Sequence, residues 1–417
     1  MKKYLFTCRG RIPYFCVALG LQCLIAVTCN GAESLIVSLN TIQDRVRKQN
    51  PDLAAARYRI AEAKGRFVQS GRRSNPELGI DTSHNTRSRE YGMSVSIAQK
   101  FPVTNRLELE KAVSYTSLKA AEAEVLDVER RLVAESKQLL VKVLAIRKQM
   151  ELLRQQEKVA KELADYIRKA ADKGEGSALD AGQAKLEAAQ FTNSIRQLNA
   201  QAASLNGQLK PLLGMSTDES LVISGSLPTL KLPARSVAPG RRPDLHAAKL
   251  HALAASEAAI LERAKRLDDI EVSVSAGLDR EEDAPNGYEN EVIVGIGVRI
   301  PLPLWNKNEG AIQEADARKA RKQKEVQALA HNIRHQASGA YKEMMEWAKL
   351  AREIDNNLLP LAQKQNKLAE QAYREGQSDL QDLLRVRDQQ LKLQASLNQA
   401  NENYQLARIR YFAALNK

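Results

Sequence analysis

Hydrophobic and polar positions alternate one by one between residues 270 and 301, which is the pattern of β-strands with two different faces. In the first arm, aliphatic side chains share one face: Ile270, Val272, Val274, Ala276 and Leu278. After a polar turn expected at 279–290, the second arm continues the pattern from Val292 to Ile300. Each arm has about ten residues, the length with which a tilted strand crosses a bilayer. The segment therefore predicts a hairpin of a membrane barrel, although a soluble β-sandwich can show the same alternation.

The same plan occurs earlier in the chain, so the sequence contains an internal repeat. The motif Pro51-Asp52-Leu53 returns as Pro243-Asp244-Leu245, and an Ala-rich helical stretch follows each copy. The first copy has its own predicted hairpin at 77–101, whose second arm alternates from Tyr91 to Phe101. Two copies predict four strands in each chain. Because four strands cannot close a barrel, several protomers have to share one.

Each predicted hairpin is followed by helical segments that are too long for a compact domain. Neither Gly nor Pro interrupts the chain from Arg106 to Lys173, and as one helix this stretch is on the order of 100 Å long. The chain then turns back, which predicts a helical hairpin at 106–213. The second copy predicts another at 306–416, with a kink or joint near Pro360. Such long, charged helices are stable only when they pair along their length.

These elements predict an order of segments along the chain. The first repeat is expected at 33–216 and the second at 241–417, each with a helix, a strand hairpin and a long helical hairpin. The linker at 217–240 contains three prolines, which indicate an extended crossing. Residues 1–32 have basic residues, then an apolar run, then small residues, which is the plan of a secretory signal peptide. A retained membrane anchor is the alternative.

The composition agrees with extended helices, because 27% of the residues are charged and only 5% are aromatic. The net charge of +13 comes from interspersed charges of both signs, which indicates a solvated helical surface rather than a nucleic-acid site. The four cysteines lie in the leader or at its end, so no disulfide framework is expected in the mature chain. Lipidation of Cys23 or Cys29 stays open, although the residues before them do not match a bacterial lipoprotein signal.

The turns of the two helical hairpins have the same spacing of three residues: a glycine, a helix-capping residue and a carboxylate residue. A glycine closes the first helix, a Ser or Asp can cap the second, and an Asp lies in its first turn, where the helix dipole favours it. In an oligomer, the same carboxylates could instead ring the narrow end of a tube. The residues concerned are Gly174, Ser177 and Asp180 in the first turn, and Gly376, Asp379 and Asp382 in the second.

No pattern in the chain predicts an enzyme or a cofactor. His331 and His335 are four residues apart on a predicted helix, but no glutamate follows His331, so a metal site is not the favoured interpretation. Met344 and Met345 are interpreted as packing residues. The sequence has no nucleophile motif, no phosphate-binding loop and no paired-cysteine site.

The order of helix, strand hairpin and long helical hairpin, given twice, resembles the TolC family of bacterial outer-membrane efflux proteins. The resemblance covers essentially the whole mature chain, and its carriers include the duplicated Pro-Asp-Leu motif, Pro360 and the run Tyr373-Arg374-Glu375-Gly376 leading to Asp382. The stretch 300–306 and the following Gly310 look most like the branch that works with cobalt-zinc-cadmium pumps. The resemblance implies an α+β membrane protein: a homotrimer whose twelve-stranded β-barrel in outer-membrane lipid continues into a long periplasmic α-helical barrel.

The resemblance also implies a function. The protein would be a passive exit duct without a cofactor, docked to a periplasmic adaptor (membrane fusion) protein and to an inner-membrane RND transporter, and its cargo would be divalent heavy-metal cations. A duct for drug efflux or type I protein secretion is the alternative with the same architecture. A secreted periplasmic coiled-coil rod is the alternative of another class.

The resemblance further implies roles for individual residues. The docking tips would be Gly174, Gly176, Ser177, Gly376, Ser378 and Asp379. The periplasmic gate would be formed by Asp180, Tyr373, Arg374 and Asp382. The barrel lumen would carry Asp81, Lys100, Glu271 and Arg299. One departure is that the best-known member has an arginine two residues after the second tip glycine, where this chain has Ser378, so its Asp–Arg bridge is not expected in the same form; the nearest arginines are Arg374 and Arg385.

Overall fold

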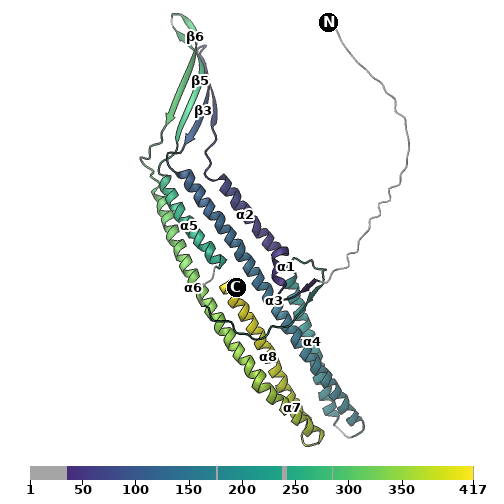
Figure 1. Ribbon diagram of the computed structural model, residues 1–417. Coiled ribbons are helices and arrows are strands. Elements are labelled where there is room, and N and C mark those ends of the chain that lie inside the picture. The colour runs from purple at the N-terminus through teal and green to yellow at the C-terminus, as the bar shows by residue number, and fades with distance from the viewer. Residues whose placement is uncertain (1–34, 175–176, 237–241, 284, 417) are drawn as a thin grey trace, which may run out of the picture.

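The structure is a computed structural model that describes residues 35–174, 177–236, 242–283 and 285–416. The molecule is long, with a sheet at one end and the tips of two helical hairpins at the other (Figure 1). Long helices connect the two ends, and each repeat contributes strands and a helical hairpin. The expected signal peptide at 1–32 and residues 237–241 of the linker region lie outside the described residues.

The sheet contains β2 (Glu77–His84), β3 (Tyr91–Phe101), β5 (Ile270–Asp283) and β6 (Gly287–Arg299). The strands pair antiparallel in the order β2-β3-β5-β6. The central pair, β3 with β5, joins the two repeats. β2 and β6 form the edges, and no further strand pairs with them in the described part of the chain.

The prediction of a polar turn at 279–290 is wrong, because both strands of the second hairpin continue into this segment. Asp279 lies opposite Glu291 and Asp283 lies opposite Gly287, so only residues 284–286 connect the strands. The ladder is made by backbone hydrogen bonds, which polar side chains do not prevent. The paired hairpin is therefore longer than the alternation of hydrophobic residues.

Each strand hairpin leads into long antiparallel helices. α3 (Arg106–Asp172) packs against α4 (Ala178–Leu212). In the second repeat, three helices follow one another: α6 (Glu309–Glu353), α7 (Leu359–Arg374) and α8 (Leu380–Leu415). The joint expected near Pro360 is confirmed as a π-helical turn at Ile354–Leu358. Proline has no N–H for the usual bond to residue i−4, so the helix changes its hydrogen bonding beside it.

The duplicated Pro-Asp-Leu motif begins the helices that precede the hairpins. α2 (Pro51–Gln69) follows α1 (Ile42–Gln49), and α5 (Pro243–Ala264) opens the second copy. In both, proline is the first helical residue, where its missing N–H costs no helical bond. Asn50 is buried and caps α2, because its Oδ1 accepts a hydrogen bond from the Leu53 N–H at 2.8 Å.

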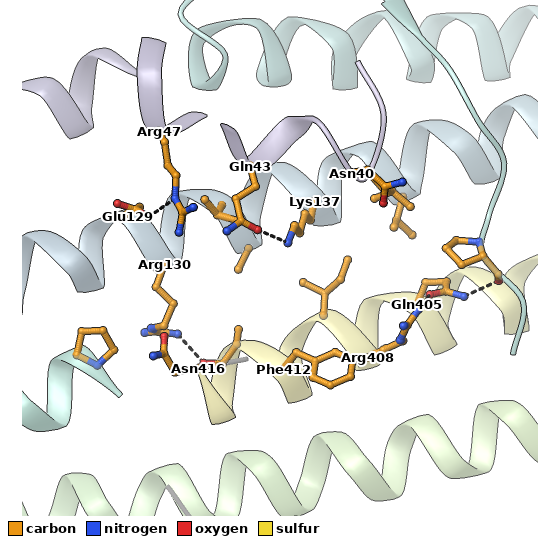
Figure 2. A pocket seen from close by; sticks show the side chains of 18 of the residues that line it. Asn40, Gln43, Arg47, Glu129, Arg130, Lys137, Gln405, Arg408, Phe412 and Asn416 are labelled. Carbon is orange, nitrogen blue, oxygen red and sulfur yellow. Dashed lines mark hydrogen bonds and ion pairs between the residues drawn. The ribbon is translucent and has the colours of Figure 1, made fainter. Parts of the chain in front are cut away.

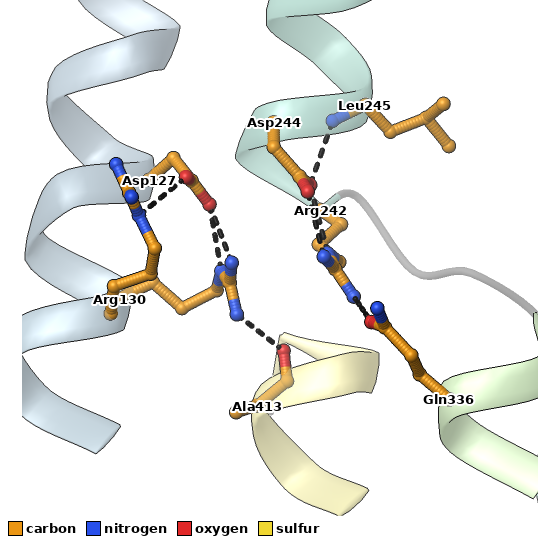
Figure 3. Close-up of polar contacts among 8 residues, drawn as sticks. Asp127, Arg130, Arg242, Asp244, Leu245, Gln336 and Ala413 are labelled. Carbon is orange, nitrogen blue, oxygen red and sulfur yellow. Dashed lines mark hydrogen bonds and ion pairs between the residues drawn. The ribbon is translucent and has the colours of Figure 1, made fainter. Parts of the chain in front are cut away.

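Arg242 occupies the position before α5 and starts a polar network between the helices (Figure 3). Its guanidinium donates hydrogen bonds to the two carboxylate oxygens of Asp244 at 2.8 and 2.7 Å, and a third to Gln336 of α6 at 3.2 Å. Burial opposes the charge on Asp244, but the bonds from Arg242 outweigh it and lower the pKa of this carboxyl below its ordinary value.

The neighbouring part of the network fastens α3 to the end of α8. Arg130 donates to Asp127, one turn earlier in α3, at 2.6 Å, and to the carbonyl oxygen of Ala413 at 3.0 Å. Arg131 also binds Asp127, at 3.0 Å. We call this middle region, where α1, residues 217–236 and the end of α8 meet α3, the waist.

The linker is not the plain extended crossing that was expected. Within it, β4 (Leu221–Ile223) pairs in parallel with β1 (Leu35–Val37), and no sequence pattern had indicated either strand. Further along, the linker crosses α8, and the hydroxyl of the buried Tyr404 donates a hydrogen bond to the Lys231 carbonyl at 2.5 Å. The linker is therefore held at the waist by both a strand and a side chain.

Hydrophobic packing is divided among separate clusters instead of one core. The largest cluster lies at the waist and contains Leu140 of α3 and Leu209 of α4. A second lies between α6 and α8 and contains Met344 and Tyr404, which confirms the interpretation of Met344 as a packing residue. A long molecule of this kind has no single centre in which all apolar side chains can meet.

The Arg242–Asp244 pair yields a test of stability. We expect Asp244→Asn to lower the free energy of unfolding by roughly 2 kcal/mol, because it leaves a buried guanidinium without its charged partner. Thermal melts of the detergent-purified protein, followed by circular dichroism, measure the effect. Glu343→Gln is the control: it removes the exposed pair with Arg410 and should hardly change the melt.

The stability difference between the wild type and Asp244→Asn should depend on pH. The folded-state pKa of Asp244 lies below the ordinary 3.8, so its stabilising effect is complete above that value and is lost as the pH falls through the depressed pKa. The difference in Tm between the wild type and Asp244→Asn should therefore be largest near neutral pH and disappear in strong acid. A difference that stays constant down to about pH 2 would contradict this account.

Candidate functional site

The two faces of the sheet differ sharply in chemistry. One face carries a continuous set of exposed aliphatic side chains, and Ile296 on it is 79% exposed. Cross-strand register aligns these side chains in rows, one of which contains Leu78, Ile97, Val274 and Ile296. So much aliphatic surface on one side of a sheet indicates contact with an apolar surrounding.

The opposite face is lined by glycine and serine. Gly297 lies opposite Ser273, and Gly295 lies opposite Ser275. A Cβ atom added at Gly297 would come within 2.6 Å of the Ser273 Oγ, so a larger residue there would have to displace its neighbour. This face is therefore smooth, polar and free of large side chains over much of its length.

Three of the four residues expected in a lumen come together on this polar face, near the helical end of the sheet. Arg299 binds Glu271 at 2.6 Å, and Lys100 lies opposite Glu271 in the register and binds Glu77 at 3.4 Å. Asp81 shares the face but lies opposite Ser94, nearer the hairpin turns. The charges at the helical end of this face therefore neutralise one another, whereas nearer the hairpin turn two carboxylates meet, because Asp279 lies opposite Glu291.

The turns at the helix tips have the local structure that their spacing predicted. Gly174 and Gly376 have φ of +80° and +71°, the left-handed conformation that favours glycine after a helix. Ser177 Oγ accepts a hydrogen bond from the Leu179 N–H at 3.2 Å, and Asp379 accepts one from the Asp382 N–H at 2.8 Å.

Two other residues of the expected tips differ from the rest. Gly176 lies outside the described residues. Ser378 has a buried Oγ with no hydrogen-bond partner in the described part of the chain.

Of the residues expected at a gate, Tyr373 and Asp180 face each other across the two hairpins. Tyr373 packs with Ile167 of α3, Ala184 of α4 and Leu380 of α8. Burial raises the pKa of the Tyr373 hydroxyl, and the negative charge of Asp180 raises it further. The two hairpin tips therefore contact each other within one protomer.

Neither arginine considered at this end reaches the other hairpin. Arg374 binds Glu370 one turn away in α7 at 2.7 Å, and Arg385 binds Asp382 one turn away in α8 at 3.0 Å. Both arginines are exposed. As surface ion pairs within single helices, they contribute little to holding the tips together.

The arginine buried between the hairpins is Arg387, which sequence reasoning missed. It is 8% exposed, its Nη2 lies 3.9 Å from a carboxylate oxygen of Glu370, and it faces Glu187 of α4. Burial raises the pKa of Glu187, and the charge of Arg387 partly offsets this. A signal did exist, because Leu380, Leu383 and Arg387 have the spacing of one buried helix face.

A cavity of about 730 Å³ lies at the waist between α1, α3 and α8 (Figure 2). Cationic side chains dominate its wall. Lys137 donates a hydrogen bond to Gln43 at 3.0 Å, and Arg47 binds Glu129 at 2.5 Å. Burial lowers the pKa of Lys137, and the nearby charge of Arg47 adds to this effect. With Arg130 and Arg408 also in the wall, the cavity is unsuited to binding a metal cation.

Nothing in the described residues forms a metal centre. No group of three or more His, Cys, Asp or Glu side chains there is placed to hold a metal ion. His331 and His335 lie side by side, with ring centroids 4.3 Å apart. Among the same residues, no helix is both long enough and apolar enough to cross a membrane.

A family comparison identifies this architecture. Residues 42–215 and 235–417 match the model of the outer membrane efflux proteins. The chain belongs to this family. It is an outer-membrane efflux channel that extends into the periplasm, and it is not an enzyme. The interpretations of the chain as a soluble sandwich or a secreted rod are thereby excluded.

Individual relatives of this efflux channel are distant in sequence but similar in fold. The cobalt-zinc-cadmium resistance protein CzcC of Cupriavidus metallidurans is 24% identical over 349 residues, which are 80% of this chain and 79% of that protein. The channel CusC has a TM-score of 0.74 at 18% identity, with 90% of this chain and 91% of that chain covered. VceC of Vibrio cholerae also gives 0.74 at 18%, with 90% and 95% covered.

The buried arginine of this efflux channel yields a prediction. We expect Arg387→Gln to loosen the contact between the tips, because Glu187 and Glu370 would lose a buried cationic partner. Amide hydrogen exchange in residues 183–190 and 380–390 should become about tenfold faster. Arg374→Gln is the matched control, since it removes an exposed arginine that also binds Glu370. If both variants accelerate exchange equally, burial of Arg387 has no special role.

Proposed function

We propose that the channel is a homotrimer with a closed barrel of twelve strands. The support is the sheet itself, because β2 and β6 pair with no further strand among the described residues and a membrane tolerates no open edge. Three copies joined edge to edge would satisfy these bonds. The aliphatic face would meet outer-membrane lipid, and the Gly and Ser face would line the lumen, with Asp81, Lys100, Glu271 and Arg299 on its wall.

The helices would continue this barrel through the periplasm as an α-helical barrel. Their tips, at Gly174 to Ser177 and Gly376 to Asp379, would dock a periplasmic adaptor protein, which connects the duct to an inner-membrane RND transporter. Glycine turns and capped helix ends give an exposed surface of defined shape, suited to recognition by another helical hairpin.

The cargo we propose is divalent heavy-metal cations. The observation that carries this proposal is the similarity to CzcC, which extends over 80% of the chain. The polar face of the sheet supports passive transport, since its ion pairs neutralise one another and its small side chains leave no tight binding site. Selection of the cargo would then belong to the transporter and not to the duct.

Closure of the duct would depend on the contact between the tips. Asp180 lies close to Tyr373 where the two hairpin tips meet, and Asp382 lies in the first turn of α8. In a trimer, three copies of each carboxylate would surround the axis. Arg374 would be at the edge of this region, bound to Glu370.

Deletion of the gene tests the cargo. We expect cells without the channel to lose resistance to zinc, cobalt and cadmium, and to regain it with the intact gene, because the pump then has an exit through the outer membrane. Growth is compared on these metals and on a panel of drugs. Sensitivity to drugs but not to metals would keep the channel and assign it to drug efflux. Loss of a secreted protein from the medium would instead indicate type I secretion.

A double variant tests the gate. We expect Asp180→Asn with Asp382→Asn to raise single-channel conductance in planar bilayers by at least about twofold, because the tips would lose the attraction of the Asp180 carboxylate for the Tyr373 hydroxyl and the ion pair of Asp382 with Arg385. Asp165→Asn, an exposed carboxylate that pairs within α3, is the control and should leave conductance unchanged. Unchanged conductance in the double variant would remove both residues from the gate.

A further inference from the structure

Arg280 is a charged residue on the aliphatic face of the sheet. It follows Leu278 on the same face of β5, and in the register it lies between Tyr91 of β3 and Asn290 of β6. Tyr288 of β6 is on this face too, one row closer to the hairpin turn. Both neighbouring strands belong to the same protomer, so the surroundings of Arg280 are complete within one chain.

Two tyrosine rings hold the guanidinium in place. The Cζ atom of Arg280 lies 6.0 Å from the centroid of the Tyr91 ring and 5.4 Å from that of the Tyr288 ring. Both distances are within the range of cation–π attraction. The side chain is thereby oriented before any ligand arrives.

No carboxylate in the described part of the chain pairs with Arg280. Within the described part of the chain it forms no ion pair, and its Nε is shielded from water without a hydrogen-bond acceptor. Glu282 lies two positions further along β5 on the same face and does not pair with it. By contrast, Lys100 and Arg299 on the opposite face both have carboxylate partners.

The position of Arg280 along the strand indicates its depth in the membrane. The aliphatic rows extend from Ile270 to Leu278 on β5. With the rise and tilt usual for barrel strands, they span roughly 20 Å along the membrane normal, close to the apolar band of outer-membrane barrels. Arg280, Tyr91 and Tyr288 come directly after this band, on the side of the hairpin turns. That is the level of the outer lipid headgroups, where tyrosines gather.

We infer that Arg280, held between Tyr91 and Tyr288, binds the phosphate group of an outer-leaflet lipid headgroup. A guanidinium presents paired N–H donors that match the oxygens of a phosphate, and it does so best where water is partly excluded. The aliphatic surface below would contact the acyl chains of the same lipid. The inference goes beyond the proposed function, because it involves neither the cargo nor the pump.

Native mass spectrometry of the full-length channel in detergent tests the inference. The probes are lipid A with its phosphates, the same lipid without them, and inorganic phosphate. We expect phosphorylated lipid A to bind the wild type about tenfold more tightly than the Arg280→Gln variant. Arg299→Gln, on the opposite face, is the matched control and should bind like the wild type.

Two further variants separate charge, geometry and folding. Arg280→Lys keeps the charge but not the paired donors and should bind at an intermediate level. Tyr91→Leu with Tyr288→Leu should also weaken binding while the charge remains. Equal lipid binding by the wild type and Arg280→Gln would overturn the inference, as would equal binding of the lipid without phosphate. Displacement of the lipid by an equal concentration of inorganic phosphate would assign the site to free anions and also overturn it.

Discussion

The hydrogen-bond ladder between β3 and β5 determines the architecture of the whole sheet. It joins the strands of the two repeats into one sheet, and its register places Val95 opposite Ala276, so that most aliphatic side chains of both hairpins share one face. A shift of one residue would turn the aliphatic side chains of one hairpin to the face of the glycines and serines. The same sheet has its edges at β2 and β6, and within the described part of the chain no further strand pairs with them, which is the observation behind the proposed trimer.

The helical part follows a different rule, because it has no single core. α4 packs against part of α3, and α8 packs against α6 and α7, while local clusters and polar contacts fasten one helical hairpin to the other. At the waist this is done by Arg130, which reaches the Ala413 carbonyl, while Arg242 binds Gln336 and connects the start of α5 to α6. Near the tips it is done by Tyr373 and Arg387. Buried polar contacts of this kind have little tolerance for the loss of one partner, and they therefore define how the hairpins sit against each other.

Local sequence patterns are sufficient to predict the long helices and strands. Alternation placed β3 at Tyr91–Phe101, the absence of glycine and proline placed α3 from Arg106, and Pro360 marked the joint at which a π-helical turn is found. The polarity of the segment after Leu278 predicts a turn, but the structure has paired strands there, because side-chain polarity does not determine backbone pairing. β1 and β4 could not be predicted, since each has three residues and exists only through its distant partner. At the tips, the arginines nearest the glycine were considered, whereas the buried one is Arg387.

The amino-acid order alone predicts several features: two-residue alternation for the strands, long uninterrupted helices, their turns and caps, and the duplication that makes both halves alike. These are properties of neighbouring residues, and they follow from backbone geometry and local hydrogen bonding. Which charged side chains are buried or paired across elements follows from the folded chain and not from local patterns. Arg374 and Arg387 look alike in the sequence, yet one is exposed on its own helix and the other is buried between hairpins; Arg299 is paired, whereas Arg280 lies between two tyrosines. The reason is physical: the effect of a charge depends on its burial and on groups brought close from distant parts of the chain.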